Sequence, residues 1–201
     1  MKPRPTYTNL GIGVGITNSV VFLARNTNEK NAALGITASV VYGLSKSFRL
    51  SFDYTRYGRI DISPTWYDIK ANTFEANLQI MFKSKSDFYF YPMFGLSYNE
   101  FKGYFTGKND YLNLNSIYPA NANVTSRWLG FNSGVGLEYN FKPVIIFGGA
   151  KMRVGVSEGD SGLNIMDVCY TFGIRYNLIV PTLYKLFRGG SRYNLDLRKK
   201  V

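Results

Sequence analysis

Apolar and polar residues alternate with a period of two along most of the chain, and this pattern constrains the fold more than any other feature. In residues 10–17, Leu, Ile, Val and Ile alternate with Gly, Gly, Gly and Thr. Successive side chains of a β-strand point to opposite faces, so the alternation predicts strands with one apolar and one polar face. Eight stretches show it: 10–17, 34–44, 48–55, 73–82, 88–98, 129–141, 144–154 and 167–178. Ile145 and Phe147 blur the register of the seventh stretch, and Val20 to Ala24 could prolong the first.

The connections between these stretches alternate in length. Short turns are expected at residues 45–47, 83–87 and 142–143, and longer loops at 18–31, 57–68, 103–126 and 156–165. Outer-membrane barrels have short turns at one end and long loops at the other. Strands of about ten residues also have the length that a tilted membrane strand needs. The sequence therefore predicts an all-β protein: an eight-stranded antiparallel up-and-down transmembrane β-barrel in residues 1–178, followed by a basic periplasmic tail in 179–201.

The main alternative is a soluble barrel of lipocalin type, with its apolar face inside. However, 12 of the 20 glycines fall on the polar register, and small residues suit a crowded lumen better than a surface in water. Two aromatic girdles at the membrane interfaces are also expected. At the short-turn end they comprise Tyr42, Phe48, Phe82, Phe88, Tyr139, Phe141 and Tyr176, and at the long-loop end Tyr54, Trp66, Tyr67, Tyr98 and Trp128. Both observations favour an apolar face that meets lipid.

The polar register also carries charge, with four positive and four negative residues. Ions in a narrow barrel are costly to desolvate, and mutual pairing makes them tolerable. We therefore expect a neutral lumen that contains an ion-pair network. Its members are Arg49, Asp53, Glu75, Glu138, Lys151, Arg153, Asp167 and Arg175.

Composition excludes much familiar enzymology. The chain has no His and one Cys, which removes His-dependent triads, His-dependent metal sites, internal disulfides and cysteine-based zinc sites. Cys169 is expected to be an inert small residue of the lumen. The glycines at 11, 13 and 15 lack the spacing of a dinucleotide loop, and Glu158 with Asp160 offers too few ligands for tight cation binding. We expect no enzymatic activity, no cofactor and no metal.

The segment Tyr170-Thr-Phe-Gly-Ile-Arg-Tyr-Asn-Leu178 carries a resemblance to a known family. It is similar to the final strands of small eight-stranded outer-membrane barrels of the OmpX and OmpA transmembrane-domain type, especially in Bacteroidota. The resemblance covers residues 8–178 and implies the architecture and an outer-membrane location. Such barrels commonly end on an aromatic assembly signal, whereas this chain continues to Val201. Its first residues contain two prolines and no apolar core of a signal peptide, so we expect either a mature form or a protein that stays in the cell.

The net charge of +11 is unevenly distributed over this topology. The long loops and adjoining strand ends carry eight positive and seven negative residues, whereas the short-turn end and termini carry twelve positive and two negative. This basic end could attract anionic lipid headgroups or dock onto an acidic envelope protein or the cell wall. The tail residues expected to make the contact are Lys185, Arg188, Arg192, Arg198, Lys199 and Lys200.

An eight-stranded barrel is filled by side chains, so a diffusion pore is not expected. The sequence favours a non-enzymatic accessory subunit of an envelope complex, in secretion or outer-membrane assembly, with outer-membrane lipid and an envelope protein as partners. A stand-alone adhesion barrel is the alternative. The 103–126 loop, rich in Tyr and Asn, could form an adhesive or partner surface or could fold over the barrel mouth. Nucleic acid is not an expected partner in this compartment.

Overall fold

The computed structural model describes residues 7–23, 31–62, 66–84, 87–106, 120–156 and 165–181. These residues form ten strand segments, all of them antiparallel to their neighbours. Nowhere in these ranges is there a helix with the length and hydropathy to cross a membrane. The segments are β1 (Tyr7–Leu23), β2 (Asn31–Gly43), β3 (Phe48–Tyr57), β4 (Ile60–Ile62), β5 (Trp66–Ile80), β6 (Phe82–Lys83), β7 (Phe88–Phe105), β8 (Ala122–Asn140), β9 (Val144–Gly155) and β10 (Ile165–Pro181).

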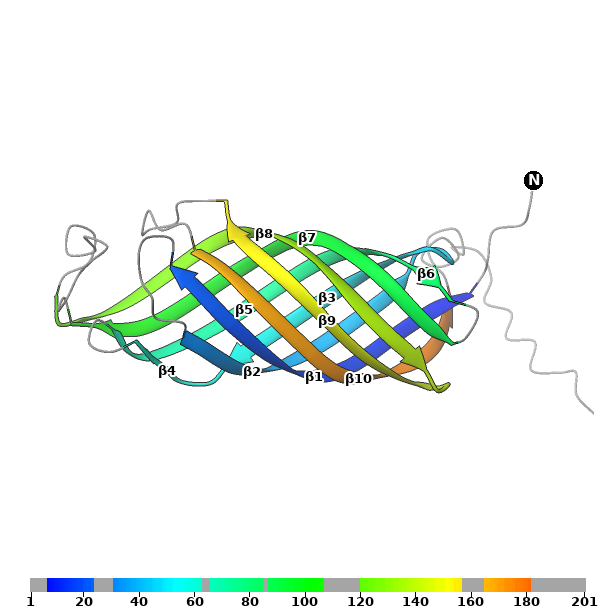
Figure 1. Ribbon diagram of the computed structural model, residues 1–201, viewed down its shortest axis with the longest axis horizontal. Coiled ribbons are helices and arrows are strands. Elements are labelled where there is room, and N and C mark those ends of the chain that lie inside the picture. Colours follow the sequence, from blue (N-terminus) through cyan, green and yellow to red (C-terminus); the bar gives the residue numbers. More distant parts are fainter. Residues whose placement is uncertain are drawn as a thin grey trace, which may run out of the picture.

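The sheet closes on itself (Figure 1). Its order is β4-β5-β3-β2-β1-β10-β9-β8-β7-β6, and pairing of β5 with β7 completes the ring. The first and last strands pair along their whole length, from Tyr7 opposite Pro181 to Leu23 opposite Ile165. The closed, eight-stranded, antiparallel barrel expected from the sequence is confirmed, and β10 runs three residues past the expected boundary at residue 178.

Ten segments make eight strands because β6 continues β5, and β4 continues the hairpin of β3 and β5. β6 pairs with β7 in the register that β5 already follows, as shown by Gln79 opposite Met93 and Phe82 opposite Phe90. Between them Ile80 lies opposite Pro92, which has no backbone N–H to donate. The ladder is therefore interrupted at this point, although Met81 still donates its N–H to Ser47 O at 2.7 Å on the β3 side.

The expected loop at 57–68 is instead an extension of the β3–β5 hairpin. β4 pairs with β5 through Ile60 opposite Ile69 and Ile62 opposite Trp66. The β5–β7 register shifts between Tyr67 and Lys70, and Asp68 there has a φ of 52°. Such a bulge inserts a residue into one strand and breaks the two-residue period. The alternation therefore did not mark the first residues of β5.

Several strands are longer than the ten residues expected. β7 and β8 have 18 and 19 residues, and they pair to the end, Phe105 opposite Ala122. β9 pairs with β8 only from Gly130 to Asn140. The β7–β8 hairpin, with β4 and β5 beside it, therefore extends past β1, β9 and β10 at the long-loop end (Figure 1). The expected loops at 18–31 and 103–126 are correspondingly shorter, because strands occupy their outer residues.

The apolar face of the barrel points outward, opposite to a lipocalin-like arrangement. Ile36, Leu96 and Phe172 are 70%, 63% and 65% exposed, while Thr17, Ser51 and Asn132 on the other register are buried. An apolar outer surface with a polar interior is typical of membrane barrels. This outward face includes the apolar stretches of all eight strands.

Three residues correct or complete the register expected from the sequence. Trp128, expected in the long-loop girdle, follows the inward register with Gly130 and lies edge-on to Phe101, with ring centroids 5.7 Å apart. Ile145 and Phe147 also point inward and are 2% and 8% exposed. The expected short-turn girdle residues Phe48, Phe82, Phe88, Tyr139, Phe141 and Tyr176 are exposed and Tyr42 is half-buried; at the other end Tyr54 and Tyr98 are exposed, and the side chains of Trp66 and Tyr67 lie outside the described part.

Candidate functional site

The lumen is the first candidate site, and small residues make room for its large ones. Gly136 on β8 faces the ring of Tyr91 on β7, and a Cβ atom at position 136 would overlap that ring. The other partner of the ring is the guanidinium of Arg49, whose Cζ lies 4.7 Å from the ring centroid. Glycine therefore allows an aromatic side chain and a cation to stack inside a narrow barrel.

Three of the eight expected lumen residues form an inner cluster near the short turns: Arg49, Glu138 and Arg175. Arg49 donates from Nη1 and Nη2 to Glu138 Oε1 and Oε2 at 2.8 and 2.6 Å. Arg175 donates to Oε2 of the same carboxylate. Two cations and one carboxylate give this inner cluster a net charge of +1. Phe147 lies beneath Arg175, 5.3 Å from Cζ to the ring centroid.

The other five residues form a middle cluster: Asp53, Glu75, Lys151, Arg153 and Asp167. Glu75 accepts hydrogen bonds from Lys151 and, at 3.0 Å, from Arg153 Nη1. Arg153 Nε also donates to Asp167 Oδ1 at 2.8 Å, while Lys151 Nζ lies 3.9 Å from Asp53 Oδ2. Three carboxylates and two cations give the middle cluster a net charge of −1, which offsets the +1 of the inner cluster.

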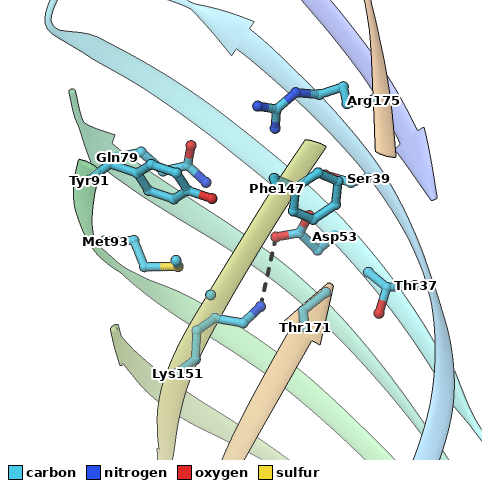
Figure 2. A pocket seen from close by; sticks show the side chains of 11 residues that line it. Thr37, Ser39, Asp53, Gln79, Tyr91, Met93, Phe147, Lys151, Thr171 and Arg175 are labelled. Carbon is cyan, nitrogen blue, oxygen red and sulfur yellow. Dashed lines mark ion pairs between the residues drawn. The ribbon is translucent and has the colours of Figure 1, made fainter. Parts of the chain in front are cut away.

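A small cavity separates the two clusters (Figure 2). Its volume is about 30 Å³, and its lining includes Asp53, Lys151, Arg175, Tyr91 and Phe147. That is space for about one or two water molecules. Figure 2 shows Lys151 and Asp53 directed toward each other on one side of the cavity, with Arg175 above them. Within the described strands, the lumen is thus filled by paired charges rather than by an open channel.

Hydroxyl groups complete the polar packing around the lumen. Thr17 hydrogen-bonds to Thr171 at 2.9 Å and to Thr37 at 2.5 Å, and Thr37 hydrogen-bonds to Thr55 at 2.8 Å. These contacts join β10, β1, β2 and β3. Buried polar groups that are hydrogen-bonded to one another stabilise a single arrangement of the surrounding strands.

The arrangement offers little to chemistry. Each lumen carboxylate lies within 4 Å of at least one cation, and Cys169 is 1% exposed among them. A general acid or base needs access to a substrate as well as a proton to transfer. Glu158 and Asp160 lie outside the described residues.

The two proposed contact regions are described only in part. The tail residues Lys185, Arg188, Arg192, Arg198, Lys199 and Lys200 lie outside the described residues. In the 103–126 region, Tyr104 is exposed on β7 and Phe105 is fully buried. Lys46, Lys83 and Lys142 are exposed at the short turns, so positive charge is present at that end of the barrel.

Sequence reasoning missed two features of the site. The first is that each lumen arginine faces an aromatic ring, Tyr91 for Arg49, Phe147 for Arg175 and Tyr57 for Arg153. The inward parity of Tyr57, Tyr91 and Phe147 could have revealed these pairs. The second is an apolar interior at the long-loop end, where Ile69, Phe105 and Val124 are buried. No pattern marked it, because there the apolar residues point inward instead of outward.

Comparisons with known proteins agree with the architecture. No protein-family model and no curated protein matches the chain. Neisserial surface protein A has a TM-score of 0.63 and 16% identity, covering 83% of this chain and 96% of its own. Ail from Yersinia pestis has a TM-score of 0.56 and 15% identity, and the match covers 85% of this chain and 99% of Ail.

The N-terminal β-barrel domain of Pseudomonas aeruginosa OprF has a TM-score of 0.54 and 14% identity, covering 84% of this chain and 97% of its own. At such identities the likeness shows the fold alone. It does not bear on the expected Bacteroidota origin, which stays a prediction. The chain has the fold of the small eight-stranded outer-membrane β-barrels.

Proposed function

We propose that this chain is a non-enzymatic outer-membrane barrel that uses its long-loop end to bind partners at the cell surface. The observation that carries the proposal is the β7–β8 hairpin, which continues for eight residues past the last β8–β9 pair, from Leu129 to Ala122. A sheet this long exceeds what a bilayer crossing needs, and its buried interior of Ile69, Phe105 and Val124 gives it a core.

The filled lumen supports the same proposal. A barrel blocked by two charge clusters is poorly suited to transport, and it makes a rigid base for a binding surface. Ail, one of the similar structures, has been solved in complex with the heparin analogue sucrose octasulfate (TM-score 0.55, 13% identity, covering 85% of this chain and 99% of its own). A sulfated glycan is therefore a reasonable first probe for this chain.

The test replaces residues 107–119 with a short Gly-Ser linker in full-length protein displayed on bacterial cells. We expect severalfold weaker attachment to immobilised heparin and to cultured epithelial cells. The matched control replaces residues 24–30 with the same linker. Attachment that survives the first replacement unchanged, or that falls equally with both, would contradict the proposal.

A second candidate is the accessory subunit of an envelope complex, in secretion or outer-membrane assembly. It is favoured by the positive charge of the short-turn end, with exposed Lys46, Lys83 and Lys142 and a basic tail in the sequence. Its test is purification in mild detergent of the full chain and of a chain that ends at Pro181. An envelope protein that co-purifies only with the full chain supports it, and identical partners with both chains would sink it.

A further inference from the structure

Three rows of outward-facing residues lie at the long-loop end, two of them crossing β3, β5, β7 and β8 and the third crossing β5, β7 and β8. Each row joins residues that are direct partners on adjacent strands. The first row marks the edge of the apolar band and contains Tyr54, Phe74, Tyr98 and Leu129. The second contains Arg56, Asn72, Glu100 and Arg127, and the third contains Lys70, Lys102 and Thr125. The change from apolar residues to charged or polar residues is therefore abrupt and occurs at the same level on four strands.

The second and third rows contain four cations, Arg56, Lys70, Lys102 and Arg127, which we call the cationic rim. Glu100 is the carboxylate within these rows, so their net charge is four minus one, or +3. Its oxygens lie 3.1 Å from Lys102 Nζ and 2.8 Å from Arg127 Nε. Two neighbouring cations thus share one carboxylate.

The third row places Lys70 directly opposite Lys102. Like charges opposite each other destabilise a sheet, and nearby anions offset the effect. Asp68 lies 3.5 Å from Lys70 Nζ, and it also lies 3.5 Å from Arg59 Nε. The side chains of Lys70 and Lys102 remain 66% and 59% exposed, which leaves both accessible to a further anion.

The position of the rim identifies that anion. Aromatic residues at the upper edge of a barrel's apolar band lie at the interface with lipid headgroups. The cationic rim lies one and two rows beyond this edge, toward the long loops. Its side chains point away from the barrel axis. A lipid headgroup in the outer leaflet meets such a surface directly, whereas a soluble glycan approaches the loops from above.

We propose that the cationic rim binds the phosphate groups of a phosphorylated glycolipid in the outer leaflet. Guanidinium and ammonium groups are both effective phosphate ligands, and juxtamembrane cations add to the binding of anionic lipids. The proposal requires a barrel in the outer membrane with its long loops outside. It does not require the adhesive function proposed above.

The test measures binding of bisphosphorylated and dephosphorylated lipid A to the full chain in detergent micelles, by native mass spectrometry. We expect the phosphorylated lipid to bind more tightly. The Lys70→Gln/Lys102→Gln variant should weaken its binding about 10- to 30-fold, from the loss of two juxtamembrane cations. Glu100→Gln should strengthen it, because Lys102 and Arg127 are freed for phosphate.

The matched control is Lys46→Gln/Lys142→Gln, which removes the same charge from exposed residues at the short turns. Binding by this control should stay within about twofold of the wild type. Heat-dependent migration on SDS gels verifies that each variant has folded. Equal binding of the two lipids, or equal weakening in the control, would overturn the proposal. A third outcome would also overturn it: sucrose octasulfate binds through Lys70 and Lys102, whereas lipid A binds equally well with and without its phosphates.

Discussion

Glu138 shares its carboxylate between two arginines and is the one carboxylate of the inner cluster, which makes it the residue whose charge the lumen can least lose. Its side chain is 3% exposed, and the side chains of Arg49 and Arg175 beside it are 11% and 2% exposed. Removing one member of a buried ion pair leaves its partners uncompensated, at a cost of about 3–5 kcal/mol. We expect Glu138→Gln to lower the free energy of unfolding by that amount, measured by urea unfolding of the micelle-refolded barrel with tryptophan fluorescence.

Asp68 provides the matched control for this prediction. It also lies between two cations, Arg59 and Lys70, but its side chain is 47% exposed. Exposed ion pairs contribute about 0–1 kcal/mol, and asparagine tolerates the positive φ of this position. Asp68→Asn should therefore change stability by less than about 1 kcal/mol. Similar losses in both variants would show that burial does not decide the value of these pairs.

Glycine has a different role on the two faces of the barrel. At position 136 an added Cβ would overlap the Tyr91 ring, whereas at position 148 the nearest atoms, Phe172 Cδ2 and Thr171 O, are 3.7 Å away. Overpacking a tight interior costs about 1–3 kcal/mol. We expect Gly136→Ala to destabilise the barrel by that amount and Gly148→Ala to be neutral or to stabilise it by about 0.5 kcal/mol. The same unfolding assay checks both, and an equal effect would contradict the assignment of the two faces.

At the scale of the strand, Pro92 explains why β5 and β6 are separate segments. Replacing it with valine supplies the missing N–H opposite Ile80, where the register is already correct. A hydrogen bond contributes about 0.5–1.5 kcal/mol. We expect P92V to stabilise the barrel by up to this amount and its new amide at position 92 to exchange slowly with deuterium by NMR.

Phe94 is the contrasting position on the same strand. It pairs with Leu78 on β5 and with Ser133 on β8, and like Pro92 it faces outward. Phe94→Pro removes a ladder donor from the middle of the sheet, which costs about 3 kcal/mol or more. Rapid exchange at position 92 in P92V, or normal folding of Phe94→Pro, would show that proline does not cause the break.

The strands that the sequence predicted well are those that cross the apolar band. There lipid requires every second residue to be apolar, so the period of two is strong in β1, β2, β3 and β10. Beyond the band this requirement ends, and residues such as Lys102 and Arg127 point outward instead. The extensions of β7 and β8 and the whole of β4 therefore escaped the pattern.

The composition of the lumen followed from parity, but its contacts did not. Alternation placed Arg49, Glu138 and Arg175 on one register, and it could not show that two arginines share one carboxylate. That depends on the stagger between strands far apart in the sequence, such as β3 and β8. The same stagger separates the inner cluster from the middle cluster, and no local pattern contains it.

At the scale of the whole molecule, net sums of charge conceal local structure. The long-loop end appeared nearly neutral from the sequence, with eight positive and seven negative residues. The fold gathers four of those cations and one carboxylate into the cationic rim, with a charge of +3. Likewise a neutral lumen consists of one cluster at +1 and another at −1. Partner binding and packing depend on these local values rather than on the sum.

The two lumen clusters also determine what can pass through the barrel. Each closes the interior at a different level, with the small cavity between them. We expect the wild type to show no steady ion conductance above background in planar lipid bilayers. Tyr91→Ala should enlarge the cavity next to the inner cluster and still give no conductance, because Glu75, Lys151, Arg153 and Asp167 continue to close the middle of the lumen.

A wide outer-membrane porin serves as the positive control for insertion and recording, and heat-dependent migration on SDS gels shows that the variant has folded. Conductance steps in Tyr91→Ala alone would mean that the inner cluster is the barrier and that the middle cluster opens under voltage. Steps in the wild type would mean that both clusters open. Either outcome would show a gated barrel instead of a sealed one. The absence of conductance steps in both proteins would favour the binding surfaces at the two ends as the functional parts of the molecule.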